Sequence, residues 1–397
     1  MSAASAGALT GIRVVDFSRI LAGPFATQIL GDLGAEIIKV EAPGGDDSRA
    51  YGSASGGVRP VFASYNRNKK SVVVDLKSEE GRGIAQHLVA SADVLVHNYR
   101  SGVIDKLGLG YEELKASHPD LIYCEITGFG SRGPLKNKAA VDLIAQAYSG
   151  LLSFTGEPGR DPVRVPVSIS DLTAGVYAAL GVLAALLWRE RGGTGQKIET
   201  SLLEALLSLI SVNLTQAILT GIPPRAMGTG NGMGQPNQVF RAQDGMVAVA
   251  AANDRMWTRF CRALKAEELA DDERFAVLAS RYENRGALTE EIGLRMKSFT
   301  VADIVARCDD EGVVCAPVLD LGQVAQDEQV RTLKSIVNVR YAGHELPVVN
   351  NPLHLSSTEP TVIADPPALG EHTAEILDGL GYDAARVAQL REAGVIA

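Results

Sequence analysis

The chain has 397 residues, of which 46% are hydrophobic and 21% are charged, and its formal net charge is −9. This length allows a large core and more than one domain. The composition excludes a disordered or collagen-like chain, and the negative charge disfavours nucleic acid or an anionic membrane as the main partner.

The first half of the sequence alternates short apolar strands with helical segments. The predicted strands are residues 12–18, 35–43, 71–78, 93–99 and 121–130, and the helices between them include 24–34 and 79–92. This alternation predicts an α/β fold with a mostly parallel, Rossmann-like sheet covered by helices. In such sheets ligands bind at the carboxyl ends of the strands.

The second half is predicted to begin with two long helices, at 172–188 and 201–219. Further on we expect a strand at 246–251 and helices at 254–264, 281–299, 301–311 and 383–392. Residues 1–200 are predicted to form the first part of a large α/β domain, 223–328 a smaller α+β domain, and 343–397 a segment that returns to the large domain.

The N-terminus lacks the basic start and apolar core of a signal peptide. The run 172–188 lies at the lower limit of membrane-spanning length and is rich in Ala and Gly, so we interpret it as a helix buried in protein. The four cysteines have no metal-like spacing and are predicted to be reduced. We therefore expect a cytoplasmic protein with no membrane partner.

Asp171 is the acid that precedes this apolar run, since no residue from Leu172 to Trp188 carries a charge. An aspartate at this place can cap the helix by accepting hydrogen bonds from free backbone amides. It can also serve as a carboxylate nucleophile, because small residues follow it and leave room for a substrate. Position alone does not choose between these two interpretations.

A glycine-rich stretch, "GTGNGMGQPNQVF", carries glycines at 228, 230, 232 and 234. A dinucleotide site needs a strand before and a helix after such glycines, whereas Pro236 and an extended run follow here. Glycine permits backbone conformations that other residues avoid, so a mobile flap that excludes water is one interpretation. A plain exposed loop is the other.

Basic residues gather near predicted strand ends and turns, where they could surround phosphates or could simply be solvated. They are Arg67, Lys69, Lys70, Lys77, Arg100 and Lys106. The six histidines form neither an H-E-x-x-H motif nor a close cluster, and no G-x-S-x-G motif is present. No metal site is predicted.

The chain resembles the family III CoA-transferases (the CaiB/BaiF family) from about Leu9 to its C-terminus. The stretches that carry this resemblance include "VVDFSRILAGPFATQILGDLGAEIIKVEAPGGDDSR", "NRNKKSVVVDLKSEEG", "ADVLVHNYRSGVIDKLGLGYEEL" and "SDLTAGVYAALGVLAALLWRERGGTGQKIETSLLEA". The resemblance implies CoA transfer from an acyl-CoA such as succinyl-CoA to a small, often dicarboxylic, acid. It also implies an interlocked homodimer, a coenzyme A thioester as substrate and no prosthetic group.

Within this resemblance Asp171 falls on the nucleophilic aspartate, which passes through aspartyl anhydride and aspartyl-CoA thioester intermediates. We expect amide donors to offset the cost of its burial and to keep it ionised. Asp142 falls on an acidic position that faces the nucleophile and is expected to orient the acceptor. Gly232, Gly234 and Gln235 resemble the lid of the family, and Arg225 is either a partner for the distal carboxylate of a diacid or an exposed loop arginine.

The CoA contacts that the resemblance implies are Arg19, Ile20, Leu21, Ala22, Ala42, Val74, Asp75, Leu76, Lys77, Asn98, Tyr99, Arg100, Lys106 and Lys138. Ala42 stands where some relatives use an arginine, so an adenine-stacking contact is expected to be missing. Lys138 is expected to replace a basic residue that relatives carry where this chain has Ala139. Lys106 fits a phosphate partner.

Two departures from the family pattern bear on the substrate. Leu21 replaces a polar residue of the oxalate enzyme, which weakens oxalate as the acceptor. Val141 stands where the related 2-methylacyl-CoA racemases have a histidine, so one half of their acid–base pair is absent. A racemase and a non-catalytic CoA-binding protein remain the alternative functions.

Overall fold

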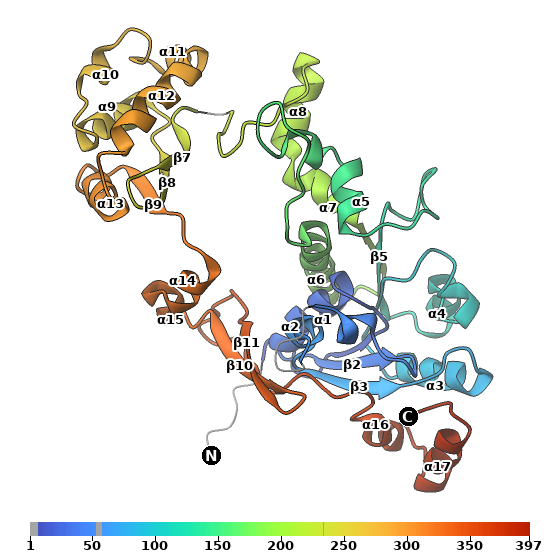
Figure 1. Cartoon of the computed structure of the whole chain (residues 1–397). Helices are drawn as coiled ribbons and strands as arrows, with labels where there is room; N and C mark the ends of the chain where they lie inside the picture. Colours follow the sequence, from blue (N-terminus) through green and yellow to red (C-terminus); the bar gives the residue numbers. More distant parts are fainter. Residues whose placement is uncertain (1–6, 53–57, 233) are drawn as a thin grey trace. The chain divides into compact units, whose positions relative to one another are not determined.

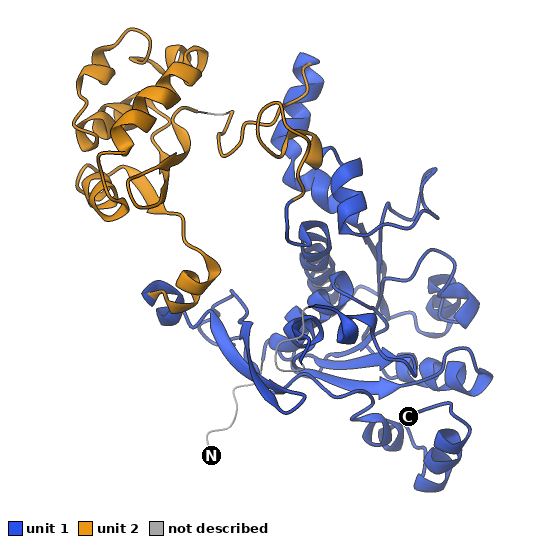
Figure 2. Cartoon of the chain, in the orientation of Figure 1, with its two compact units in different colours: residues 1–151, 165–221, 328–397 blue, residues 152–164, 222–327 orange. Residues whose placement is uncertain are grey.

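The computed structural model describes residues 7–52, 58–232 and 234–397 and divides into two compact units (Figures 1 and 2). Unit 1 comprises Met1–Leu151, Val165–Gly221 and Glu328–Ala397, and unit 2 comprises Leu152–Arg164 and Ile222–Asp327. The sequence had assigned residues 152–164 to the large domain, whereas the structure groups them with unit 2.

A six-stranded parallel sheet forms the centre of unit 1, with the strand order β3-β2-β1-β4-β5-β6. The strands are β1 (Arg13–Asp16), β2 (Glu36–Glu41), β3 (Lys69–Val73), β4 (Val94–His97), β5 (Ile122–Thr127) and β6 (Lys197–Ser201). The first five were predicted, although β3 begins at Lys69 and therefore earlier than expected. β6 was missed because its sequence, KIETS, is polar and largely lacks the apolar pattern of a buried strand.

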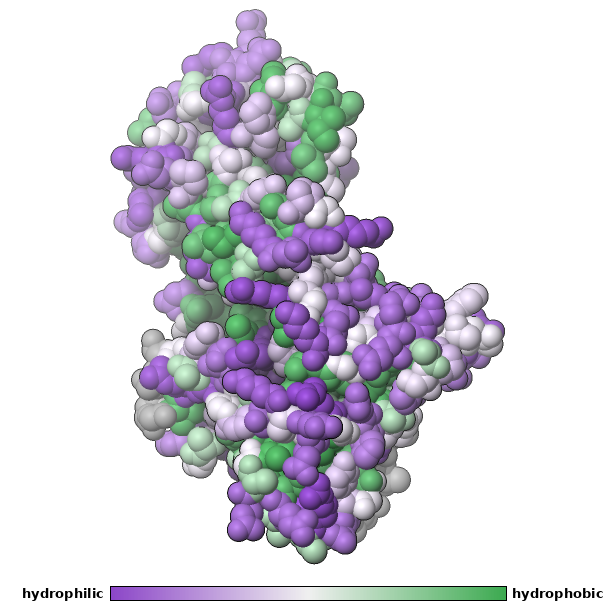
Figure 3. Space-filling view, turned by 90° about the vertical axis from the view of Figure 1, so that its right-hand side faces the viewer, coloured by the Kyte–Doolittle hydropathy of each residue, from purple (hydrophilic) through white to green (hydrophobic). Residues whose placement is uncertain are grey.

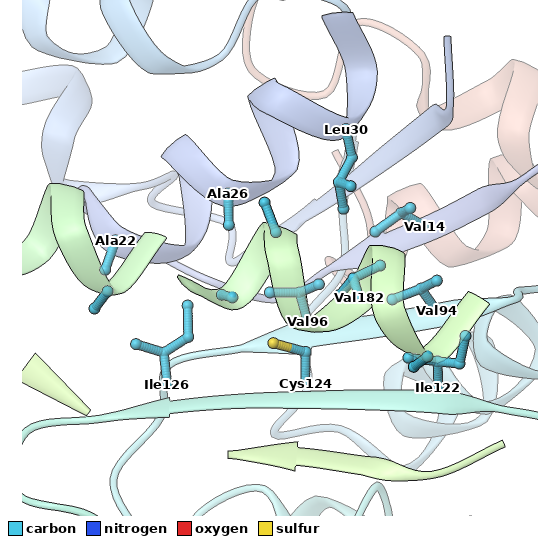
Figure 4. Close-up of a cluster of buried hydrophobic side chains, with 14 of the residues drawn as sticks. Val14, Ala22, Ala26, Leu30, Val94, Val96, Ile122, Cys124, Ile126 and Val182 are labelled. Atoms are coloured by element: carbon cyan, nitrogen blue, oxygen red, sulfur yellow. The ribbon is translucent and has the colours of Figure 1, made fainter. Parts of the chain in front are cut away.

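Helices cover both faces of this sheet. On one face α1 (Ala22–Asp32) and α6 (Ile169–Glu190) pack on apolar side chains of β1, β4 and β5. Figure 4 shows Ala22 on the side of Ile126, and Val182 close to Val96. A second core on the other face contains residues of α3 (Glu79–Ala90), α4 (Tyr111–Ser117), α16 (Thr373–Gly379) and α17 (Ala384–Glu392). The sheet is thus buried on both sides, as a parallel sheet requires.

Helix α6 contains the uncharged run and is long and apolar enough to cross a membrane, by length and composition. Its small residues Ala174, Gly175 and Ala178 are buried against α1 and the sheet. The predicted helix at 201–219 is instead two helices, α7 (Leu202–Leu209) and α8 (Ser211–Thr220), which are bent by 74°. The sequence has no Gly or Pro there, and the bend falls at Ile210, which is buried.

The remaining elements of unit 1 are shorter. They are α2 (Pro60–Tyr65), α5 (Asp142–Tyr148), α15 (Glu328–Thr332) and the antiparallel hairpin β10 (Ile336–Tyr341) and β11 (His344–Val349). Three short 3-10 helices are Asp47–Ala50, Asp105–Leu107 and Leu151–Phe154, of which the last spans the border between the units.

Unit 2 is an α+β unit with its own core around Trp257 and Phe260. Its antiparallel sheet has the order β7-β8-β9 and consists of β7 (Asn237–Arg241), β8 (Met246–Ala250) and β9 (Val314–Pro317). Its helices are α9 (Asp254–Ala263), α10 (Glu268–Asp271), α11 (Leu278–Glu283), α12 (Arg285–Met296), α13 (Val301–Asp310) and α14 (Leu321–Gln326).

The surface carries hydrophobic residues among a hydrophilic majority, and the face in Figure 3 shows green areas between larger purple ones. In unit 1 several of the exposed apolar residues lie on α6 and α8. Leu180 and Trp188 of α6 are 58% and 57% exposed, and Ile218 and Leu219 of α8 are 73% and 80% exposed. Exposed apolar residues in such number favour a surface that another protein chain covers.

Candidate active site

The carboxyl group of Asp171 lies in the first turn of α6, and Ser168 is the residue that precedes this helix. The capping interpretation of Asp171 is therefore wrong, because the residue lies inside the helix and not at its N-cap. Burial, and next the negative charge of Asp142, raise the pKa of Asp171 to about 7. The amide donors that we expected to keep Asp171 ionised are not among the causes of this pKa.

Asp142, the first residue of α5, is buried and holds the start of α6. Its Oδ1 accepts hydrogen bonds from the backbone N and the Oγ of Ser170, at 2.9 and 2.8 Å. Its Oδ2 accepts from Nε2 of Gln146 at 2.7 Å. The side chain of Gln146 also bonds the backbone N and O of Val165, at 3.0 and 3.1 Å. Asp142 is thus tied to the residue next to Asp171, and its expected contact with the acceptor stays a prediction.

Tyr65, the last residue of α2, was not singled out by the sequence. Burial, and next the charge of Asp171, raise the pKa of its phenol, so the tyrosine lies close enough to sense the carboxylate. Its ring packs edge-on against Phe25 of α1, with 5.7 Å between the ring centroids. A neutral phenol is a hydrogen-bond donor that could serve an oxyanion. Tyr65 directly precedes the segment "NRNKKS", of which the sequence analysis considered only the basic residues.

Helices α1 and α6 approach each other closely one turn after Asp171. A Cβ atom on Gly175 would lie 2.7 Å from the carbonyl oxygen of Ala22 and 3.1 Å from Cδ1 of Phe25. Only glycine allows this spacing without a shift of the neighbouring backbone. The start of α1, where the turn after β1 ends, is therefore packed beside the helix that carries Asp171.

Most of the predicted CoA contacts follow the carboxyl ends of four neighbouring strands. β1 is followed by Arg19, Ile20, Leu21 and Ala22, and β2 is followed by Ala42. β3 is followed by Val74, Asp75, Leu76 and Lys77, and β4 by Asn98, Tyr99 and Arg100. These strands are adjacent and parallel, so the structure brings the residues to one edge of the sheet. The sheet grows in opposite directions from β1 and β4, which makes the space between them a topological switch point.

Several of these residues are already engaged within the protein, among them Val74, Asn98 and Arg19. Val74 is fully buried, its backbone N donates to the carbonyl of Glu41, and it bridges to Ile396. The side chain of Asn98 bonds the backbone of Arg19. The side chain of Arg19 pairs with Asp47 and is exposed.

Lys106 and Lys138 are both exposed, and neither belongs to the strand ends named above. Lys106 lies in the 3-10 helix Asp105–Leu107, and Nζ of Lys138 lies 5.8 Å from the ring centre of Phe129. A cavity of about 560 Å³ lies elsewhere in unit 1, between the β10–β11 hairpin and residues 360–365, and contains none of the predicted site residues.

The predicted lid residues, Arg225, Gly232, Gly234 and Gln235, belong to unit 2, whereas Asp171 belongs to unit 1. Gly234 and Gln235 are buried, and the carbonyl of Gln235 accepts a hydrogen bond from Nε of Arg281 at 2.9 Å. Gly232 and Arg225 are exposed. Their roles as lid and acceptor contact stay predictions.

A sequence model of CoA-transferase family III matches residues 9–373. The chain belongs to this family. It is 36% identical to a succinate–glutarate CoA-transferase of Agrobacterium fabrum, over 93% of this chain and 94% of the relative. It is 38% identical to an acetyl-CoA:oxalate CoA-transferase of Acetobacter aceti, over 88% of this chain and 90% of the relative.

A crystal structure of a CAIB/BAIF family protein from Brucella suis has the same fold, with a TM-score of 0.85 and 35% sequence identity. The superposition covers 95% of this chain and 100% of the other. The predicted family and the α/β fold class are thus confirmed, and the protein is an enzyme of CoA-transferase family III.

Family III CoA-transferases act on CoA thioesters, and the exposed Lys77, Arg100 and Lys106 suit the phosphates of this ligand. Arg67 and Lys69 are neither solvated nor open to a phosphate, because they are buried in ion pairs with Asp32 and Asp16. Among the residues that the structure describes, no group of His, Cys, Asp and Glu could hold a metal ion.

Proposed function

We propose that this CoA-transferase moves CoA from succinyl-CoA, or a similar acyl-CoA, to a small dicarboxylic acid. The observation that carries the proposal is the state of Asp171, a partly buried carboxyl group with a pKa of about 7 in the first turn of α6. Carboxyl groups with pKa values perturbed by burial and by a like charge are typical of catalytic sites. Relatives that are named for succinyl-CoA with glutarate, mesaconate or D-citramalate favour a dicarboxylate acceptor.

In the proposed reaction the ionised Asp171 attacks the thioester carbonyl of the donor. A bond forms between its Oδ and the acyl carbon, the C–S bond breaks, and an aspartyl anhydride and CoA thiolate result. The thiolate then attacks the aspartyl carbonyl and releases the donor acid, which leaves CoA joined to Asp171 as a thioester.

The acceptor carboxylate next attacks this thioester, so that a second anhydride forms and CoA thiolate leaves. The thiolate attacks the acyl carbonyl of the acceptor, and Asp171 departs as a carboxylate in its starting state. Each step passes through an oxyanion, for which the phenol of Tyr65 is a candidate donor beside Asp171. No redox step and no metal enter this sequence.

Anhydrides and activated thioesters are lost if water reaches them, so the reaction needs a dry site. We propose that the glycine stretch with Gly232, Gly234 and Gln235 covers the intermediates and that Arg225 binds the far carboxylate of the acceptor.

We also propose an interlocked homodimer, which the exposed apolar residues of α6 and α8 support. The free cysteines among the described residues support a cytoplasmic location.

The test is a mass measurement on the intact enzyme after incubation with succinyl-CoA and no acceptor. We expect a covalent CoA adduct that hydroxylamine removes and that the Asp171→Ala variant does not form. Exchange of the α-hydrogen in deuterated water without an adduct would instead indicate a 2-methylacyl-CoA racemase. CoA binding with neither outcome would indicate a non-catalytic CoA-binding protein.

The acceptor acid is tested separately with a panel that contains glutarate, malate, citramalate, itaconate, mesaconate and oxalate. We expect a dicarboxylate longer than oxalate to give the highest kcat/KM. A clear preference for oxalate would contradict the inference drawn from Leu21.

A further inference from the structure

The turn that joins β1 to α1 has an unusual backbone. Ile20 has a φ of 71°, which lies in the left-handed region. This conformation is costly for a β-branched residue and persists only where the surrounding structure enforces it. The same turn carries Arg19–Ala22, the segment at the carboxyl end of β1 that we expect to receive CoA.

Asp46, in the segment after β2, holds this turn on one side. Its two carboxylate oxygens accept from the backbone N of Ile20, at 3.1 and 3.2 Å. The same carboxylate accepts from Nζ of Lys39 at 2.8 Å and from the backbone N of Ser48 at 2.9 Å. Nζ of Lys39 also donates to the carbonyl of Ser18 at 3.0 Å, so the lysine bonds the turn directly.

The Lys39–Asp46 pair is almost completely buried, with side chains 0% and 1% exposed. Burial by itself would raise the pKa of Asp46, but the charge and hydrogen bond of Lys39 and the bonds from Ser48 outweigh it and hold this pKa at about 2. Asp46 therefore stays ionised at neutral pH, and its hydrogen bond to Ile20 is charge-assisted.

Asn98, which follows β4, holds the turn on the other side. Its Oδ1 accepts from the backbone N of Arg19 at 2.9 Å, and its Nδ2 donates to the carbonyl of Arg19 at 2.8 Å. The oxygen and the nitrogen of the side-chain amide thus both form hydrogen bonds with the backbone of Arg19. This pair of bonds crosses the gap between β1 and β4, which is the switch point of the sheet.

We infer that Asp46 and Asn98 are positioning residues, which hold the turn Arg19–Ala22 in the strained conformation that receives CoA and do not themselves contact the ligand. For Asn98 we propose this role in place of the direct CoA contact expected from the sequence, because both polar atoms of its side chain bond the backbone of Arg19. Asp46 did not stand out in the sequence at all. The inference rests on the proposed function, since it takes CoA as the ligand of this edge of the sheet.

The test uses the full-length protein and free coenzyme A in a calorimetric titration, together with steady-state kinetics. Asn98→Ala and Asp46→Asn should each raise the Kd for CoA and the KM for the acyl-CoA about tenfold, the effect of losing one or two polar interactions. The kcat at saturating acyl-CoA should stay within about twofold, because the geometry of Asp171 is untouched. A residue that only stabilised the fold would not separate KM from kcat in this way.

Two further variants make the test specific. Asp32→Asn breaks another buried ion pair of unit 1, between the last residue of α1 and Arg67, away from the turn. It should lower Tm but leave the Kd for CoA unchanged. Ile20→Gly in the Asp46→Asn background should recover part of the lost affinity, because glycine adopts a positive φ without steric cost.

The outcomes separate the two hypotheses. If the unmodified protein does not bind CoA, the proposed function fails. If it binds CoA and both Asn98→Ala and Asp46→Asn bind it equally well, the positioning role is overturned. If Ile20→Gly recovers no affinity, Asp46 does not act through the turn, and its assignment is overturned.

Discussion

At the scale of single residues, the proposed chemistry depends on how easily Asp171 gives up its proton. Burial is the first cause of its raised pKa, and the negative charge of Asp142 is the second. A carboxylate that is poorly solvated is a stronger nucleophile and base than one in water, but it must still be ionised at the working pH. With a pKa of about 7, Asp171 is a stronger nucleophile than an ordinary aspartate and is still about half ionised at neutral pH.

This balance predicts the pH dependence of the reaction. Asp171 must be ionised to attack, so kcat/KM should fall below pH 7 as the carboxyl group takes up its proton. The Asp142→Asn variant removes the neighbouring charge and should move this acidic limb roughly one pH unit lower. The measurement is kcat/KM with succinyl-CoA between pH 5 and pH 9.

The matched control for this profile is Asp105→Asn, which removes an exposed carboxylate from the same unit and should leave the limb in place. An acidic limb that does not move in the Asp142→Asn variant would contradict the assigned influence of Asp142.

The first turn of α6 should also loosen in this variant, because an amide cannot accept hydrogen bonds from both Ser170 and Gln146 in the same way.

At the scale of elements, the pairing of α1 with α6 brings the turn Arg19–Ala22, for which we propose CoA binding, to the helix that carries Asp171. The two helices lie on the same face of the sheet and share one core (Figure 4). They approach each other closely at Gly175, where a Cβ atom would lie 2.7 Å from the carbonyl oxygen of Ala22. Small residues along α6 thus set the distance between the turn and Asp171.

We predict that Gly175→Ala destabilises the protein in spite of the better helix propensity of alanine. The added methyl group should force the helices apart and lower the free energy of unfolding by about 1–3 kcal/mol. Gly83→Ala in α3 is the control, because a Cβ there meets no atom within 4 Å, and it should raise stability by up to about 1 kcal/mol. Urea denaturation of both variants checks this, and equal shifts would contradict the role of the close approach.

Prediction from sequence succeeded for elements whose signal is local. The five strands from β1 to β5 are short apolar runs between turn residues, and the helices between them show amphipathic spacing or clear start and stop signals. It failed for β6, a polar edge strand, and for the bend between α7 and α8. The bend falls at the buried Ile210, where the sequence has no Gly or Pro to mark it.

At the scale of the whole molecule, the exposed apolar residues of α6 and α8 call for a partner surface. Water contact with side chains such as Leu180 and Ile218 is unfavourable, and a second copy of the chain would remove it. The proposed interlocked homodimer provides such a copy in every molecule.

We therefore predict a particle with twice the chain mass of 41.9 kDa. Light scattering after size-exclusion chromatography measures this mass directly. Ile218→Glu should increase the fraction of single chains or of aggregates, since a buried unpaired charge opposes association. Leu294→Glu, at an exposed apolar residue of α12, should leave the mass unchanged. A single-chain mass for the unmodified protein at every concentration would contradict the homodimer.

The sequence by itself was sufficient for the family, for the parallel α/β fold and for Asp171 as the residue to examine. The fold follows from the alternation of strands and helices, whereas the family and the choice of Asp171 follow from the motifs by which the chain resembles family III CoA-transferases. Only the tertiary structure decided that Asp46 and Asn98 bond the turn at Ile20, that Tyr65 lies near Asp171 and that Asp142 is tied to Ser170. The physical reason is that each of these depends on a contact between residues far apart in the chain, and such contacts exist only once the strands and helices have packed.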